Sequence, residues 1–310
     1  MMKLTIVICT HNRAELVLKT LESLDNAIVP ENVDITVLVI PNACSDNTIT
    51  TLQAYQAQRT AAALPIDVVE EPTAGKSYAL NKALGLVKHG WISFVDDDQR
   101  VEEQFFLASI AAIASYPDTR LFCGRVFADW TGAEPAWVHD KGDYQIRPLP
   151  LPEFDLGDED QTLAADGFIP GGGNLLIDCQ VFEKVGQYSV LLGPTGHNFV
   201  GSEDADLILR ALSAGETLCY VPKIIQYHYV DLWRFELKPL MMMNYQRNRS
   251  ITKVQAANSR KVPHYLWLKL ATYLANAAFS LSLNKTRFYL YKSAAIAGQI
   301  MGILQSSPSV

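Results

Sequence analysis

The 310-residue sequence predicts an α/β protein with a mostly parallel central sheet. Short apolar runs rich in β-branched residues alternate with amphipathic helical patterns through the first half of the chain. Such alternation is typical of βαβ units, in which helices cover both faces of a parallel sheet. The composition agrees, because 49% of the residues are hydrophobic and 19% are charged, which excludes a disordered or fibrous protein.

The expected elements follow the chain in order. Strands are predicted at residues 4–9, 35–40, 66–69, 91–95, 121–126, 174–177 and a short 218–221, with helices at 14–24, 78–87, around Glu183 and from near Ser202. Regular patterning lapses over residues 129–173, which is long for a structureless loop and indicates a functional segment. We expect an α/β domain over residues 1–236 and a helical extension over residues 237–310.

Polar segments directly follow the predicted strands. THNR (residues 10–13) follows the first strand, PNACSDNT (41–48) follows the second, and Lys76 begins the helix after the third. Ligands of open parallel sheets bind beyond the carboxyl ends of the strands, and helix N-termini there favour anions. Each segment alone is equally typical of an ordinary helix cap.

Three aspartates, Asp96, Asp97 and Asp98, end the fourth predicted strand. Adjacent carboxylates repel one another, and a hard divalent cation such as Mg²⁺ or Mn²⁺ removes that conflict. The alternative is a solvated acidic loop. The apolar run before the aspartates favours a cation site.

In this order and spacing, the segments resemble family 2 glycosyltransferases of the GT-A fold. The resemblance extends over roughly residues 3–230 and rests on THNR, PNACSDNT, EPTAGKSYALNKAL, FVDDD, GGGN and GSEDADLILRALSAG. It implies a Rossmann-like nucleotide-diphospho-sugar transferase fold and an inverting, metal-dependent enzyme of the hexosyltransferase class. Such an enzyme moves a sugar from a nucleotide donor to an acceptor hydroxyl. UDP is the nucleotide expected. Two alternatives stay open: a catalytically inactive sugar-nucleotide- or membrane-binding module, and a nucleotidyltransferase.

The resemblance also implies roles for residues. The nucleotide donor would contact Thr10, Asn12, Arg13, Asn42, Lys76, Asp96, Asp97 and Arg249. Mn²⁺ or Mg²⁺ would be bound by Asp98, Asp96 and His228, the last of which follows the short predicted strand. Pro41 stands where the family commonly has an acidic residue, which leaves the base undetermined. Arg249 belongs to QRNRS, which resembles the QxxRW element of processive members, but Ser250 replaces the Trp and argues against a processive polymerase.

The pair Glu203-Asp204 corresponds to the position of the catalytic base in the family. Inversion needs a carboxylate that takes the acceptor proton on the side opposite the leaving diphosphate. We assign this role to Asp204, with Glu203 in support. Gly172, Gly173 and Asn174 would allow the backbone to approach the acceptor closely.

The charge distribution sets the C-terminal extension apart. All 33 Asp and Glu residues lie at or before Glu236, whereas ten of the 26 Lys and Arg residues follow it. Within residues 265–283, Lys269 and other polar residues recur in one helical stripe, which favours a helix lying in a membrane interface over a spanning one. We expect Trp267, Leu270 and Leu274 to enter an anionic membrane surface. Contact with the α/β domain, or a homodimer, stays open as an alternative.

The remaining features concern location and partners. The five cysteines are scattered without a CxxC pair, which indicates reduced thiols in a cytoplasmic protein. The basic tail adds the expectation of a peripheral position on the inner face of the plasma membrane. No nucleic-acid recognition motif accompanies the basic tail, so nucleic acid is not expected as a partner. The acceptor expected is a saccharide or lipid-linked molecule, in cell-surface polysaccharide or glycolipid synthesis.

Overall fold

The computed structural model describes residues 1–60, 63–165, 167, 169–193, 203–255 and 261–305. The chain forms two compact units. The first comprises Met1–Asp129 and Pro152–Tyr229, and the second comprises Trp130–Leu151 and Val230–Val310.

The first unit is built on one sheet. Among the described residues, nine strands form this sheet in the order β3-β2-β1-β4-β8-β6-β9-β5, with β7 paired to β9. The strands are β1 (Met2–Thr10), β2 (Val33–Pro41), β3 (Ile66–Val68), β4 (Trp91–Phe94), β5 (Gln99–Val101), β6 (Leu121–Asp129), β7 (Gln161–Leu163), β8 (Leu175–Asp178) and β9 (Leu218–Tyr229). Strands β1, β2, β3, β4, β6 and β9 share one direction, so the expected mostly parallel sheet is confirmed.

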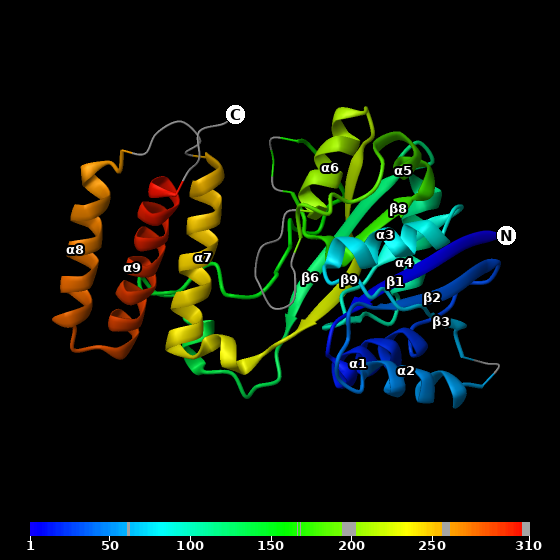
Figure 1. Ribbon diagram of the computed structural model, residues 1–310, viewed down its shortest axis with the longest axis horizontal. Helices are drawn as coiled ribbons and strands as arrows, with labels where there is room; N and C mark the ends of the chain where they lie inside the picture. The colour runs from blue at the N-terminus through cyan, green and yellow to red at the C-terminus, as the bar shows by residue number, and fades with distance from the viewer. Residues whose placement is uncertain (61–62, 166, 168, 194–202, 256–260, 306–310) are drawn as a thin grey trace. The chain divides into compact units, whose positions relative to one another are not determined.

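Helices cover both faces of the sheet (Figure 1). They are α1 (Ala14–Asp25), α2 (Thr48–Ala57), α3 (Lys76–Leu86), α4 (Phe105–Ser115), α5 (Cys179–Val185) and α6 (Glu203–Ser213), with the 3₁₀ turn η2 (Gly172–Asn174) before β8. Side chains alternate along β1, so Leu4, Ile6 and Ile8 pack with α1, α2 and α4 in one core. Val7 faces the other core with α3, α5 and α6. Ser202, near which the last of these helices was predicted to begin, lies outside the described residues.

The parallel register places the polar segments at one edge. Thr10 pairs with Pro41, and Val7 pairs with Phe94. The carboxyl ends of β1, β2 and β4 therefore meet, as expected for an open parallel sheet.

Strand β9 corrects one sequence prediction. The strand expected at residues 218–221 continues to Tyr229, so His228 lies within the strand and pairs with Gln99 of β5. Pro222 lacks an amide hydrogen to donate to a ladder. The pairing with β6 instead shifts register, from Cys123 with Tyr220 to Arg125 with Ile225, and the strand resumes beyond this bulge.

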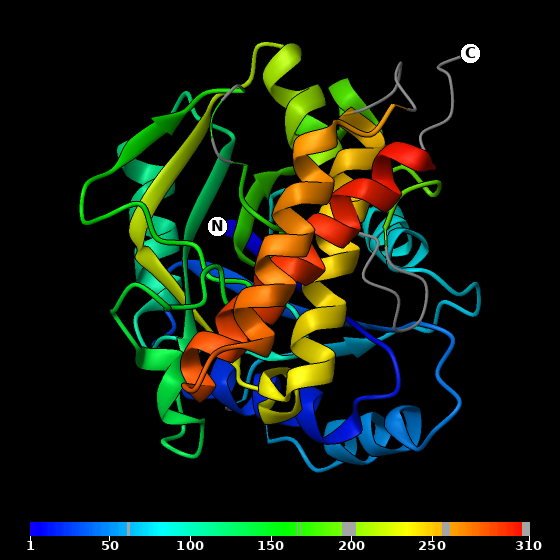
Figure 2. The same cartoon turned by 90° about the vertical axis from the view of Figure 1, so that its left-hand side faces the viewer.

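The second unit contains the expected C-terminal helices. They are α7 (Leu237–Gln255), α8 (His264–Ala278) and α9 (Leu283–Leu304), preceded by η3 (Leu232–Phe235). Helix α9 packs against both α7 and α8 (Figure 2). Gly298 and Gly302 make the α7 contact close, because a Cβ at Gly302 would lie 2.6 Å from Arg249 O and one at Gly298 would overlap Tyr245 O. Among the described residues, no helix is both long and apolar enough to cross a membrane.

The segment 130–151 folds with these helices. It contains η1 (Ala136–His139), and its Ile146 is buried with Leu240 and Tyr291. The Tyr291 hydroxyl donates a hydrogen bond of 2.8 Å to Pro148 O. This division differs from the expected linear boundary after residue 236, because apolar contacts join a segment from the middle of the chain to its C-terminal helices.

Candidate active site

Two turns at the carboxyl ends of β1 and β2 are joined by side-chain amides. Asn12 Oδ1 accepts a hydrogen bond of 2.8 Å from the amide of Ser45. Asn42 Nδ2 donates to Glu71 O and Thr73 O, and Asn42 Oδ1 accepts from the amide of Gly75 at 2.8 Å. These contacts give the loops that follow three parallel strands a common framework. Thr10 is buried beside them, and contact of Thr10, Asn12 and Asn42 with a nucleoside stays a prediction.

Arg13 pairs with two of the carboxylates after β4. Its Nη1 lies 2.9 Å from Asp97 Oδ1 and 2.8 Å from Asp98 Oδ2. Burial and the neighbouring Asp98 raise the pKa of Asp97 to about 6, although the charge of Arg13 opposes this. The guanidinium of Arg13 therefore offsets part of the repulsion expected within the triple aspartate. Sequence reasoning placed Arg13 with the donor but did not find this bridge.

Asp98 and His228 form a buried pair that fits a divalent cation. His228 Nε2 lies 3.3 Å from Asp98 Oδ2. His228 Nδ1 lies 2.7 Å from Tyr229 O, which can only accept, so Nδ1 carries the hydrogen and Nε2 of a neutral ring directs its lone pair outward. Lone pairs facing a carboxylate at this distance need a proton or a cation between them. Imidazole and carboxylate together suit Mn²⁺.

The predicted set of three metal ligands is not assembled. Within the part of the chain that the structure describes, no group of three or more His, Cys, Asp or Glu side chains is arranged to hold a metal ion. Asp96 instead forms an ion pair with Lys76, with Lys76 Nζ 3.0 Å from Asp96 Oδ1. Binding of a metal ion by Asp98 and His228 stays a prediction, and two protein ligands are compatible with Mg²⁺ or Mn²⁺ when phosphate oxygens complete the coordination.

Lys76 connects Asp96 with the acidic pair at the start of α6. Burial alone would lower the pKa of Lys76, but Asp96, Asp204 and Glu203 together raise it well above its ordinary value. Burial raises the pKa of Asp204 to about 6, while Lys76 opposes that rise. The site thus holds a permanently charged ammonium beside a carboxyl group that is a stronger base than an exposed aspartate.

The glycine turn η2 brings Asp96 and Asp204 together. Gly172 N donates a hydrogen bond of 3.0 Å to Asp204 Oδ2, and a Cβ at Gly172 would overlap that carboxylate. A Cβ on the next residue, Gly173, would lie 2.5 Å from Asp96 Oδ2. Because adjacent glycines contact one carboxylate each, segments more than 100 residues apart share one site. Asp96, Gly172 and Asp204 line the same small cavity of about 10 Å³.

Asn174 and Arg249, two other residues predicted to bind substrate, make hydrogen bonds within the protein. Asn174 is buried, and its Nδ2 donates to Arg125 O and Ile224 O, so its amide links strands of the sheet. Arg249 lies in α7 of the second unit, where its Nε donates to Gln305 Oε1 at 2.8 Å. Acceptor binding by Asn174 and diphosphate binding by Arg249 stay predictions.

Two residues of the site were missed from the sequence. Cys9 lines the cavity with Lys76 and Asp204, and burial raises the pKa of its thiol to about 12. Tyr188 is buried against Phe94, and burial holds the pKa of its hydroxyl well above the ordinary range. Cys9 lies inside a strand and Tyr188 lies inside a loop. Neither directly follows a strand, where ligands of open parallel sheets are expected to bind.

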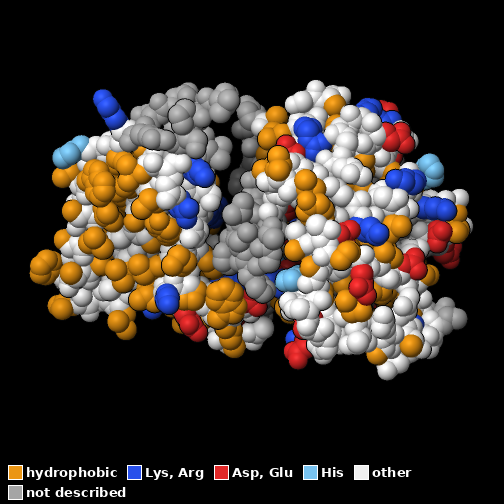
Figure 3. All heavy atoms as spheres, in the orientation of Figure 1, with side chains coloured by type: hydrophobic (Ala, Val, Ile, Leu, Met, Phe, Trp, Pro, Cys, Tyr) orange, Lys and Arg blue, Asp and Glu red, His pale blue; other side chains and the backbone are white. Residues whose placement is uncertain are grey.

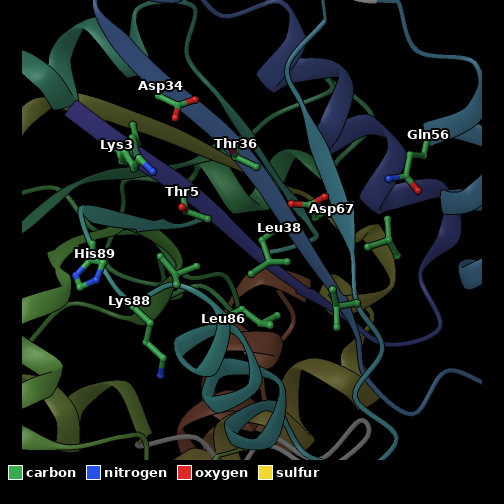
Figure 4. A pocket seen from close by; sticks show the side chains of 14 residues that line it. Lys3, Thr5, Asp34, Thr36, Leu38, Gln56, Asp67, Leu86, Lys88 and His89 are labelled. Atoms are coloured by element: carbon green, nitrogen blue, oxygen red, sulfur yellow. The ribbon is translucent and has the colours of Figure 1, made fainter. Parts of the chain in front are cut away.

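A larger hollow lies elsewhere in the first unit. It has a volume of about 630 Å³ and is lined by residues near the amino ends of β1 and β2 (Figure 4). Lys3 and Asp34, which pair in register, both line it, as do Asp67 and Lys88. The charged side chains that line this hollow are of both signs. The acidic and basic groups of the candidate active site lie elsewhere, at the carboxyl ends of the strands.

The family follows from comparison with known proteins. The protein-family model described as glycosyl transferase family 2 matches residues 5–186, more than half of the chain. The chain belongs to glycosyl transferase family 2. The protein is a glycosyltransferase, as the sequence resemblance implied. No curated protein matches this chain.

Solved structures share the fold of this family 2 glycosyltransferase. The mannosyltransferase PcManGT from Pyrobaculum calidifontis, in complex with GDP-Man and Mn²⁺, matches with a TM-score of 0.61 at 16% identity, over 98% of this chain and 86% of that one. Residues 1–349 of S. aureus TarS, in complex with UDP-GlcNAc, match with a TM-score of 0.52 at 12% identity, over 96% and 89% of the two chains. The chain spans 44% of another S. aureus TarS structure, with a TM-score of 0.50 at 15% identity over 91% of this chain. The GT-A fold is therefore confirmed.

Proposed function

We propose that this glycosyltransferase is an inverting enzyme that transfers a sugar from a nucleoside-diphosphate donor to an acceptor hydroxyl, with Asp204 as general base. The observation that carries the proposal is the convergence of Asp96 and Asp204 on adjacent glycines beside Lys76. One edge of the sheet thereby combines a base with charges suited to a diphosphate. The GDP-Man, UDP-GlcNAc and Mn²⁺ bound to relatives of the same fold support a nucleotide-sugar donor.

The transfer uses the residues of this edge in distinct ways. Asp204 accepts the proton of the acceptor hydroxyl while the oxygen of that hydroxyl forms a bond to the anomeric carbon of the sugar. The bond from that carbon to the diphosphate oxygen breaks on the opposite side, and the nucleoside diphosphate leaves with the electron pair. Lys76 and Arg13 place positive charge beside the diphosphate. A Mn²⁺ or Mg²⁺ ion bound by Asp98 and His228 would supply further positive charge to the leaving group.

The finer identity of the substrates is part of the proposal. We propose a UDP- or GDP-linked donor and a saccharide or lipid-linked acceptor, in cell-surface polysaccharide or glycolipid synthesis. Pro41 leaves the donor base undetermined, so both nucleotides enter the test.

A screen of nucleotide sugars with Mn²⁺ or Mg²⁺ tests the function. We expect release of free nucleoside diphosphate, increased by acceptor and abolished by chelation of the metal. Release of pyrophosphate from a nucleoside triphosphate and a sugar phosphate would identify a nucleotidyltransferase instead. Donor binding by calorimetry without any turnover across acceptors would favour an inactive binding module.

A further inference from the structure

The helical unit carries an apolar surface that its own core does not use. Leu266, Leu270, Tyr273 and Ala277 of α8 recur at helical spacing, and the first three pack against Ile296 and Ile300 of α9. The same helix exposes a second apolar sector. Its members are Trp267, Leu268, Ala271, Leu274, Ala275 and Ala278. Lys269, Thr272 and Asn276 form a third, polar sector, so α8 is apolar on two sides and polar on one.

The turn from α8 to α9 extends this surface. Phe279, Leu281 and Leu283 are 86%, 106% and 82% exposed. Hydrophobic side chains gather over these helices on the face that Figure 3 shows. Exposed large apolar side chains gathered on one helix and its turn are typical of a contact with a partner or a membrane. We call Trp267, Leu268, Leu274, Phe279, Leu281 and Leu283 the α8 apolar surface.

Charge selects among the partners that this surface could meet. Residues 237–310 contain ten Lys and Arg residues and no Asp or Glu. Lys269 borders the α8 apolar surface, with its ammonium 5.3 Å from the centre of the Tyr265 ring. A second copy would present the same positive charge to itself. Anionic lipid headgroups would neutralise it, at about 1 kcal/mol for each basic residue near the membrane surface.

We propose that the α8 apolar surface docks on a bilayer that contains anionic phospholipid. The helix lies in the interface plane with Trp267, Leu268 and Leu274 among the acyl chains, and the turn at Phe279, Leu281 and Leu283 inserts most deeply. Lys269 contacts headgroups. Leu270, which the sequence predicted to enter the membrane, packs in the core of the unit instead. The proposal does not depend on the sugar donor or on the catalytic role of Asp204.

Vesicle flotation of the full chain tests the proposal. Vesicles of phosphatidylcholine alone are compared with vesicles that also contain phosphatidylglycerol, at low and high salt. We expect the protein to float with the anionic vesicles, and less so as salt rises, because screening shortens to about 8 Å near physiological ionic strength. The triple variant Phe279→Ser, Leu281→Ser, Leu283→Ser should partition about tenfold less, equivalent to about 1.4 kcal/mol.

A matched control separates membrane contact from a general effect of lost apolar side chains. Ile28, Leu86 and Leu107 are 42%, 51% and 38% exposed in the first unit, and changing all three to Ser should leave flotation unchanged. Lys269→Gln should weaken only the anionic and salt-sensitive part of binding. Thermal unfolding establishes that each variant is folded.

Three outcomes would overturn the proposal. The first is failure of the unchanged protein to float with either vesicle. The second is flotation of the turn variant at the level of the unchanged protein. The third is a dimer in sedimentation that the turn variant dissociates while vesicle binding is absent, which would assign the α8 apolar surface to a second copy.

Discussion

At the scale of single residues, opposing electrostatic effects meet on Asp204. Burial raises the pKa of its carboxyl group to about 6, and the ammonium of Lys76 limits that rise. The amide of Gly172 fixes one carboxylate oxygen by a hydrogen bond of 3.0 Å. A carboxyl group with this pKa is ionised at neutral pH and is a stronger base than an exposed aspartate, which is what proton removal from a hydroxyl requires.

The substitution Asp204→Asn tests this role. The amide keeps the shape of the side chain but cannot accept the proton, so turnover should fall by about 10²-fold or more. Donor affinity, measured by calorimetry, should change little because the base acts on the acceptor. Loss of donor affinity with turnover preserved would remove Asp204 from the role of base.

The same carboxyl group predicts a pH profile. Because Asp204 must be deprotonated to act, kcat/KM should fall as pH decreases through about 6, the pKa of that group. Lys76→Met removes a positive charge that lowers this pKa, so the acid limb should move to higher pH. Lys82→Met, on the same helix, is the matched control and should leave the limb in place. A limb that stays in place or moves to lower pH in Lys76→Met would contradict the assignment.

Asp98 and His228 make the proposed cation site testable without turnover. Residues that merely support metal ligands contribute about 10- to 100-fold to metal affinity, so Asp98→Ala should weaken Mn²⁺ binding by at least that factor. His228→Ala should weaken it less, because one neutral ligand is lost instead of a charge. Calorimetric titration of Mn²⁺ with nucleoside diphosphate present measures both. Unchanged affinity in Asp98→Ala would exclude this residue as a ligand.

At the scale of elements, the turn η2 joins two halves of the site. Its glycines allow backbone to approach the carboxylates of Asp96 and Asp204 more closely than any residue with a Cβ permits. The turn leads directly into β8, which pairs with β4, the strand that precedes Asp96. The positions of the acidic residues depend on this short segment as much as on their own strands.

Gly172→Ala tests the turn. The added methyl group would overlap the Asp204 carboxylate and displace it, so turnover should fall about tenfold, while the fold, measured by thermal unfolding, should be kept. Gly171→Ala is a control one residue away, since a Cβ there meets no atom within 4 Å. Equal turnover of the two alanine variants would show that the turn does not position the base.

At the scale of the whole molecule, two stretches of the chain fold as one helical unit. Ile146 from the middle of the chain shares a buried cluster with Leu240 of α7 and Tyr291 of α9. A second cluster joins Val138 and Leu149 to Phe235. The C-terminal helices therefore depend on a segment that separates two parts of the sheet unit.

Leu240→Ala should loosen that segment. Leu240 is fully buried, so its truncation should cost about 2–5 kcal/mol of stability in the unit. Trypsin should then cleave faster after Lys141, which is measured by mass spectrometry of timed digests. Met242→Ala, at a position 50% exposed on the same helix, is the control. Unchanged cleavage in Leu240→Ala would mean that residues 130–151 fold independently of α7.

Features that depend on nearby residues were determined by the sequence alone. Periodicity and β-branched runs identified the strands that carry Thr10, Asn42 and the triple aspartate, and their common direction implied a shared edge. The acidic pair at Glu203 and the acid-free tail were likewise visible, because composition and helix starts are local properties. The α/β fold, the family and the helical character of the tail followed from these signals.

Features that depend on contacts between distant residues were decided only by the tertiary structure. Strand β9 extends through His228 because it pairs with β5 and β6. The buried side-chain amide of Asn174 links strands by hydrogen bonds. On α8, the sequence marked Trp267 and Leu270 as apolar alike, but contact with α9 buries Leu270 and leaves Trp267 outward. Periodicity states which residues share a face of an element. Which neighbour covers that face is set by free energy gained from contacts between residues far apart in the chain.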